Sequence, residues 1–351
     1  MKNLKKTTLI ITILSFLSFF TSANAEIKVV ASIKPIHSLA SYLMDGVSKP
    51  SLIVDGYASP HGFALKPSHA KMLQEADIIF WVGEDLENFL EKPLNSIAKK
   101  AEKIELIQAK GLNKLKFRER NIFDGHDDHG HDDDGHKKKD DHDDHDDDGH
   151  KKKDDHGHDE DGHKEDGHKE DGHDDHDDHE GHHHGEYDPH IWLDPINAKI
   201  ILNEMVEHLI ENDAKNASAY KSNLEKALKD IDKLTMQVMT ELNQSTSSIV
   251  FHDAYQYFEE RFNVNVLGAF TVNTDVIPGA EQLAEIREII EHDKVSCIFS
   301  AHQFNPDIIN DVAKDMDIKT GVLDPLGATL DPGKDLYFNL IKNMSKSFKG
   351  C

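Results

Sequence analysis

Short apolar runs alternate with helix-like patterns along most of the chain. Runs with the length and composition of buried strands lie at residues 27–31, 51–54, 77–82, 103–106, 248–252, 264–267, 295–300 and 318–323. Segments with helical spacing separate most of these runs. This alternation predicts an α/β fold.

One long amphipathic segment separates the first four runs from the last four. Its apolar residues recur at steps of four or three, as they do on one face of a helix: Tyr220, Leu224, Leu228, Ile231, Leu234, Val238 and Leu242. A helix over residues 213–243 would be about 45 Å long, enough to bridge two lobes. A coiled-coil partner is the alternative, but the heptads are few and irregular. We therefore expect an N-terminal lobe at 26–212, a linker helix at 213–243 and a C-terminal lobe at 244–351.

The first 25 residues have the pattern of a secretory signal peptide. Three lysines precede an apolar run at residues 9–20, and a small-residue cleavage site ends at Ala25. A membrane anchor is the alternative, but the run is shorter than the roughly 20 residues that a spanning helix needs. The sequence thus predicts cleavage after Ala25 and a protein of the bacterial periplasm, without stable membrane insertion.

Residues 124–186 consist almost entirely of His, Asp, Glu, Lys and Gly. No apolar residue occurs from 125 to 185, which predicts a disordered insert within the N-terminal lobe. Imidazoles interleaved with carboxylates favour accessory metal binding over the alternative, a solvated acidic tract. The candidate histidines are His126, His129, His131, His136, His142, His145, His150, His156, His158, His163, His168, His173, His176, His179, His182, His183 and His184.

The insert also dominates the charge of the chain. It holds 28 acidic residues and 8 lysines, a net charge of −20 out of the −26 of the whole chain. An acidic protein of this kind is unsuited to nucleic acid or anionic membranes as partners, and it suits cations.

The chain has two cysteines, Cys297 and Cys351. In an oxidising compartment, a pair with no third candidate favours a structural disulfide, here between the chain end and an expected central strand. Two unrelated thiols are the alternative.

Eight histidines lie outside the insert, and position distinguishes them. His61 lies in a loop after a predicted strand, His190 lies where apolar sequence resumes after the insert, and His252 ends a predicted strand. Such positions are where α/β proteins commonly place their ligands. His302 follows another strand and is a possible auxiliary ligand. We expect a structural role to be at least as good an explanation for His37, and solvated side chains for His69, His208 and His292.

Several motifs resemble one known family. They are V-V-A-S-I-K-P-I-H-S-L, A-S-P-H-G-F-A-L-K-P-S, W-V-G-E-D-L-E, D-P-H-I-W-L-D-P, V-F-H-D-A-Y-Q-Y-F and L-D-P-L-G. In this order they are similar to the ZnuA family, the zinc-binding components of bacterial zinc ABC importers. The resemblance covers nearly all of the chain after the signal sequence, and the His-rich insert also resembles that family. It implies two α/β lobes, each around a mainly parallel sheet, joined by one long helix, with the metal in the cleft between them.

The resemblance also implies the ligands of the transported Zn²⁺. His61 and His190 would bind the ion from the first lobe and His252 from the second, with Asp324 as the candidate for a variable fourth position. Pro60 stands where some members of the family have an acidic residue, so no carboxylate comes from that side. Asp194 and Asp253 are candidates for orienting an imidazole, although an N-cap is the better explanation of Asp194. Cys297 and Cys351 match a disulfide of some relatives.

Three imidazoles and one oxygen ligand suit zinc better than manganese. An open fourth position also occurs in zinc hydrolases, but the chain lacks H-E-x-x-H and G-x-S-x-G motifs. The sequence therefore predicts a monomeric, non-enzymatic protein that binds zinc and passes it to a membrane permease. A periplasmic metal buffer or store and a zinc-dependent hydrolase are the alternatives.

Overall fold

The computed structural model describes residues 26–118, 121–122, 185–242, 246–272 and 278–351, which belong to one compact unit. The predicted signal peptide and all the histidines of the predicted insert lie outside the described residues. Within the described residues, no helix is both long enough and apolar enough to cross a membrane.

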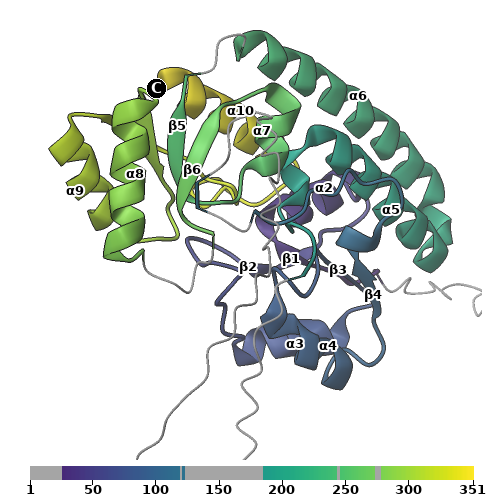
Figure 1. Cartoon of the computed structure of the whole chain (residues 1–351). Helices are drawn as coiled ribbons and strands as arrows, with labels where there is room; N and C mark the ends of the chain where they lie inside the picture. The colour runs from purple at the N-terminus through teal and green to yellow at the C-terminus, as the bar shows by residue number, and fades with distance from the viewer. Residues whose placement is uncertain (1–25, 119–120, 123–184, 243–245, 273–277) are drawn as a thin grey trace, which may run out of the picture. The chain divides into compact units, whose positions relative to one another are not determined.

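The first lobe is built on a parallel sheet of four strands in the order β2-β1-β3-β4. They are β1 (Val29–Ile33), β2 (Ser51–Val54), β3 (Ile78–Trp81) and β4 (Glu102–Glu105). Every residue of β1 and β3 is buried, as expected of central strands that have helices on both faces. Figure 1 shows α3 (Pro67–Glu75) and α4 (Asn88–Ser96) on one side of this sheet and α2 (Lys34–Leu43) on the other.

The second lobe repeats the same strand order as β6-β5-β7-β8, again with parallel pairing. Its strands are β5 (Ser248–His252), β6 (Val266–Thr271), β7 (Cys297–Ser300) and β8 (Lys319–Val322). All eight predicted strands are therefore present. The strands β1, β6 and β7 begin two residues later than predicted, and the largest difference is at β6, which ends four residues later. Around this sheet lie α7 (Gln256–Phe262), α8 (Ala280–His292), α9 (Asp307–Met316) and α10 (Leu336–Gly350) (Figure 1).

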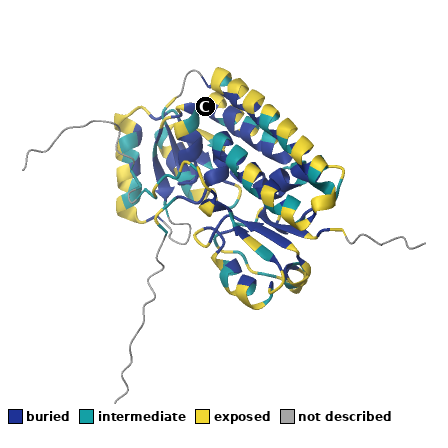
Figure 2. Cartoon of the chain, turned by 90° about the vertical axis from the view of Figure 1, so that its right-hand side faces the viewer, coloured by how far each residue is buried: buried dark blue, intermediate teal, exposed yellow. Residues whose placement is uncertain are grey.

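The long helix is α6 (Ala217–Glu241), which follows α5 (Pro195–Asn212) and leads into β5. Five of the seven residues of its predicted apolar stripe are buried, while Leu224 and Leu228 are half-buried. The stripe packs against α2, α5 and α10, and the outer face of α6 is exposed (Figure 2). Helix packing inside the protein therefore explains the stripe, and no coiled-coil partner is needed.

One hydrophobic core runs through both lobes. It includes β1 and β3 of the first sheet, the inner face of α6, and one face of the second sheet with Val250 and Phe299. The opposite face of the second sheet packs against α8 and α9 in a smaller core of its own, with Ile249 and Ile298. The shared core holds the two lobes together at the level of the site.

Polar contacts also cross from one lobe to the other. The buried Lys34 Nζ donates to the carbonyl oxygens of Gly327 (3.2 Å), Ala328 (3.0 Å) and Leu330 (3.0 Å). The indole Nε1 of Trp192 donates to the carbonyl oxygen of Pro325 at 2.8 Å. Because these donors are buried, losing their acceptors would be costly, and they fix the loop after β8 against the first lobe.

The predicted disulfide between Cys297 and Cys351 is present, with the two Cα atoms 5.6 Å apart. It joins β7 of the second sheet to the residue that follows α10, a helix that also packs against α2 and α6. The bond thus ties the chain end into the shared core.

Candidate metal centre

Three histidines that are distant in sequence come together where the two lobes meet. His61 lies in the loop after β2, His252 is the last residue of β5, and His190 immediately precedes the short 3-10 helix Ile191–Leu193. The direction of the strand order reverses between β1 and β3 in the first sheet and between β5 and β7 in the second. Open α/β sheets commonly bind their ligands at the carboxyl ends of the strands beside such a reversal. Parallel strands therefore bring two of the histidines to the sheet ends that face the cleft.

The side chains are close enough to share one ion. One ligand nitrogen from each of His61, His190 and His252 lies within 4.8 Å of the other two. The ring centroids are 5.3 Å apart for His61 and His252, 5.3 Å for His190 and His252, and 5.6 Å for His61 and His190. The three rings thus form a nearly equilateral triangle.

The rings line a cavity of about 20 Å³. Its wall consists of Ser59, Pro60, His61, His190, His252, Gln303, Phe304, Pro325 and Leu326. A volume of this size holds about one water-sized sphere, so it fits a single ion and little else. Residues from both lobes contribute to the wall, and the ion would therefore lie between them.

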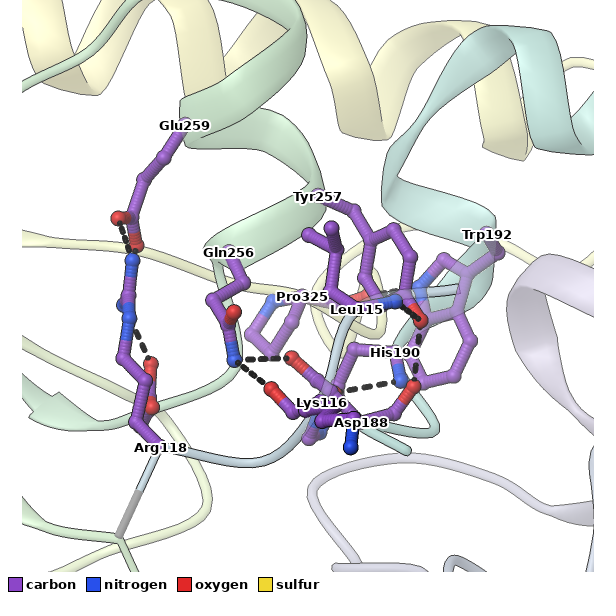
Figure 3. Close-up of polar contacts among 11 residues, drawn as sticks. Leu115, Lys116, Arg118, Asp188, His190, Trp192, Gln256, Tyr257, Glu259 and Pro325 are labelled. Carbon is purple, nitrogen blue, oxygen red and sulfur yellow. Dashed lines mark hydrogen bonds and ion pairs between the residues drawn. The ribbon is translucent and has the colours of Figure 1, made fainter. Parts of the chain in front are cut away.

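The orientation of His190 is fixed by Asp188, two residues earlier. Asp188 Oδ1 is 2.7 Å from His190 Nδ1 and also accepts the backbone N–H of His190 at 2.9 Å (Figure 3). When Nδ1 carries the proton and donates to this carboxylate, Nε2 keeps its lone pair for a metal. A carboxylate that holds the second ring nitrogen is the usual support of a metal-binding histidine. Sequence reasoning missed this role, although Asp188 begins the D-P-H motif.

Asp188 is itself held by the second lobe. Gln256 Nε2 donates to Asp188 Oδ2 at 3.3 Å, and the Tyr257 hydroxyl donates to the Asp188 carbonyl oxygen at 2.8 Å (Figure 3). Asp188 is 1 % exposed, and both partners belong to α7. The geometry of a first-lobe histidine therefore depends on a second-lobe helix.

Among the three histidines, His252 gives the clearest structural indication of a missing ligand. Both of its ring nitrogens are buried, and neither has a hydrogen-bond partner of good geometry among the described residues. Burial holds the pKa of His252 well below its ordinary value, helped by the neighbouring His61 and His190 and opposed by the backbone of Thr271. The ring is thus kept neutral, which is the form that binds a metal. A buried polar group without a partner is costly, and a metal ion would remove this cost.

The other predicted site residues lie outside this triangle. Asp324 is not in the group of mutually close ligand atoms, does not line the cavity, and accepts a hydrogen bond from the Leu326 backbone N–H at 3.2 Å. His302 is exposed and lies against Tyr57, with 5.6 Å between ring centroids. Their roles as fourth and auxiliary ligands stay predictions.

The two aspartates proposed to orient imidazoles have other partners. Asp194 caps α5 by accepting from the Ile196 N–H at 2.8 Å, as the N-cap explanation predicted, and it also pairs with Arg261 at 2.7 Å. Asp253 pairs with Arg118 at 2.9 Å, just before the chain enters the insert. Burial raises the pKa of Asp253 well above its ordinary value, and Arg118 opposes this shift.

The remaining histidines separate into structural and exposed ones. His37 is buried, with Nε2 3.1 Å from the Pro50 carbonyl oxygen, which fits a structural role. The expectation that His69 is solvated was wrong: it is 8 % exposed, stacks on Phe63 and accepts the Lys66 backbone N–H at the start of α3. His292 is exposed, as expected.

His208 belongs to a second group of possible ligands. One ligand atom from each of Glu102, His208 and Glu211 lies within 4.8 Å of the others. His208 is not simply solvated, since Nδ1 is 2.8 Å from Glu102 Oε1 and Nε2 is 3.5 Å from Glu204 Oε1. The group joins α5 to the edge strand β4.

A family model described as "Zinc-uptake complex component A periplasmic" (ZnuA) matches residues 29–351. The chain belongs to the ZnuA family. A "High-affinity zinc uptake system protein ZnuA" of Brucella abortus (strain 2308) is 44 % identical over 325 residues, covering 92 % of this chain and 91 % of the relative. The ZnuA of Yersinia pestis is 34 % identical over 330 residues, covering 93 % and 92 %. ZnuA-family proteins bind Zn²⁺, and the family is described as periplasmic.

Solved structures share the fold at low identity. A zinc-bound deletion mutant of ZnuA has a TM-score of 0.66 at 18 % identity, covering 93 % of this chain and 97 % of its own. A manganese-bound periplasmic metal-binding protein from candidatus Liberibacter asiaticus has a TM-score of 0.65 at 17 % identity, covering 92 % and 98 %. The fold therefore accommodates different metals, so the choice of metal must come from the ligands.

Proposed function

We propose that this protein captures Zn²⁺ between its lobes with His61, His190 and His252 and delivers the ion to the membrane permease of a zinc ABC importer. The observation that supports this most is the buried triangle of imidazoles around a cavity of about 20 Å³. Three neutral nitrogen donors with one remaining position match tetrahedral zinc, whereas manganese favours oxygen ligands and higher coordination.

The role is binding and transfer, without catalysis. The cavity wall adds only Ser59 and Gln303 to the three imidazoles as polar side chains, so no carboxylate base lines the cavity beside the metal. In the ordinary course of uptake, the zinc-loaded protein acts as a monomer that the permease recognises.

We also propose that the His-rich insert is an accessory collector that raises the local concentration of metal. The chain segment before the insert is anchored beside the site, and the segment after it is anchored in the first lobe. Arg118 pairs with Asp253, the neighbour of His252, while the Gly185 N–H donates to Asp85 Oδ1 at 2.8 Å in the first lobe. Ions held by the insert would therefore be concentrated near the cleft.

Growth under zinc limitation tests the transport function. Cells that lack this protein should grow poorly when zinc is chelated, and the intact gene should restore growth while the His252→Ala variant should not. His292→Ala, which removes an exposed histidine, is the matched control. A metal store would instead matter under zinc excess, and that result would contradict transport.

Titration with zinc and manganese tests the division of labour between cleft and insert. Deleting residues 125–185 should remove several weak zinc sites and leave one tight site. Loss of the tight site on this deletion would contradict an accessory role for the insert. A tight stoichiometric manganese site in the shortened protein would contradict the choice of zinc.

A further inference from the structure

The wall of the metal cavity contains two polar side chains that the proposed ligand set does not use, those of Ser59 and Gln303. Of the nine residues that line it, Pro60, Phe304, Pro325 and Leu326 have apolar side chains. Ser59 Oγ already accepts the His61 backbone N–H at 3.3 Å. Besides the three imidazoles, this leaves the amide of Gln303.

Gln303 is placed in a way that ordinary packing does not explain. Its Nε2 atom is fully buried and has no hydrogen-bond partner among the described residues. A buried amide donor without an acceptor costs about 1–3 kcal/mol, and native proteins keep few such groups. The only other ring or amide nitrogens in this cavity wall with the same property are those of His252.

An acceptor for this donor must be consistent with a nearby cation. The hydrogens of an amide NH₂ carry positive partial charge, so they cannot face Zn²⁺ directly without repulsion. An oxygen bound to the ion removes the repulsion, because it donates a lone pair to the metal and accepts a hydrogen bond from the amide. Zinc makes such a water more acidic, and the hydroxide that forms when the water loses a proton is a stronger acceptor for the amide hydrogen.

We propose that Gln303 holds a water or hydroxide in the fourth coordination position of the zinc ion, by donating a hydrogen bond from Nε2. This inference rests on the proposed three-histidine zinc site. It makes Gln303 a positioning residue and gives the fourth ligand to solvent, in place of Asp324, whose carboxylate does not line the cavity. The small cavity limits that position to one water-sized ligand.

The test compares Gln303→Met and Gln303→Ala with the intact full-length protein. Methionine keeps the length of the side chain and removes the donor. Gln237→Ala is the control, since this glutamine is exposed on α6 and bonds only Glu241 among the described residues. Zinc affinity is measured by competition with a chelator, at one metal ion per protein so that the tight site fills first. The insert is present in every variant, so differences between variants report the cleft.

We expect both Gln303 variants to bind zinc about 10–100-fold more weakly, the usual effect of losing an outer-shell partner. Cobalt in the same site should change the intensity of its visible d–d bands, which report its coordination. The thermal stability of the metal-free Gln303→Met variant should be equal to or higher than that of the intact protein, because an unsatisfied buried donor is removed. If Gln303 had a purely structural role, the Gln303→Met substitution would lower the thermal stability of the metal-free protein.

Unchanged affinity and cobalt spectrum in Gln303→Met would overturn the proposal. So would a zinc-loaded crystal structure in which the Gln303 or Asp324 oxygen binds zinc directly, with no solvent oxygen about 2.0–2.2 Å from the metal. His252→Ala separates this inference from the proposed function. If that variant loses the tight site while Gln303→Met keeps it, the zinc site stands and only the role of Gln303 fails.

Discussion

The described part of the chain holds two groups of possible metal ligands, and they differ in almost everything except spacing. In the cleft, His61, His190 and His252 place their ligand atoms within 4.8 Å of one another, as Glu102, His208 and Glu211 do on the surface. The cleft group consists of imidazoles and is largely buried, whereas the surface group is mostly carboxylate and no member of it is buried. Proximity alone therefore does not identify a metal site.

The two groups differ in whether the ring nitrogens of their histidines have polar partners within the protein. Both ring nitrogens of His208 lie within 4.0 Å of a carboxylate oxygen, so the polar contact that links α5 to β4 explains why this histidine is there. No such partner satisfies His252, whose buried nitrogens make the metal-free site costly. Buried nitrogens that lower the stability of the metal-free protein need an explanation in function. A surface group whose nitrogens already have polar partners needs no such explanation.

Replacing one histidine in each group should give the largest contrast. His252→Ala should weaken the tight zinc site by more than about 100-fold, beyond the 10–100-fold effect of an outer-shell change, because a direct ligand is lost. His208→Ala should leave the affinity of that site unchanged. Chelator competition measures both. Equal losses would mean that the two groups are not functionally distinct.

The eight strands and the long helix could be predicted from the sequence, because apolar runs and helical spacing are local signals. The meeting of His61, His190 and His252 could not be predicted from spacing, since no local pattern brings residues 61, 190 and 252 together. It came from the family resemblance. The role of Asp188 was missed because orienting an imidazole depends on side-chain geometry, and Gln303 was missed because an unsatisfied amide is visible only in the packed cavity. His69 was misjudged because polar neighbours in sequence do not reveal its stacking on Phe63.

Removing the support of one cleft imidazole tests how far preorganisation matters. Asp188→Ala should weaken zinc binding about 10–100-fold, because His190 loses the acceptor that holds Nδ1 at 2.7 Å. Glu102→Gln makes the comparable change beside His208 and should have no effect on the tight site. Thermal unfolding of the metal-free proteins shows whether Asp188→Ala remains folded. An intact affinity in a folded Asp188→Ala protein would mean that His190 needs no orientation.

The lowered pKa of His252 predicts how zinc binding depends on pH. Its ring stays neutral in the pH range where an ordinary histidine, with a pKa near 6.5, becomes protonated. Zinc therefore displaces no proton from His252, and at most two of the three imidazoles can release one. As the pH falls below 6.5, the affinity should decrease by no more than about 100-fold per pH unit, tenfold less than three protons would give. Calorimetry near pH 5.5, in two buffers with different ionisation enthalpies, measures the protons released. A zinc-bound water, with a pKa near 7, stays protonated there, so three protons per zinc would contradict a neutral His252.

The smallest effect should come from the stability of the surface group. His208→Ala removes a partly exposed hydrogen bond with Glu102, and such contacts contribute about 0–1 kcal/mol, so the free energy of unfolding should fall by no more than about 1 kcal/mol. Because the pair is partly open to solvent, salt should reduce even this difference. Denaturant unfolding of the metal-free protein at low and high salt measures it, with His292→Ala as an exposed-histidine control. If instead zinc stabilised the intact protein more than His208→Ala by an amount that grew with zinc concentration, the surface group would be a binding site. The contrast between a surface group whose polar atoms have partners and a metal centre whose polar atoms lack them would then fail.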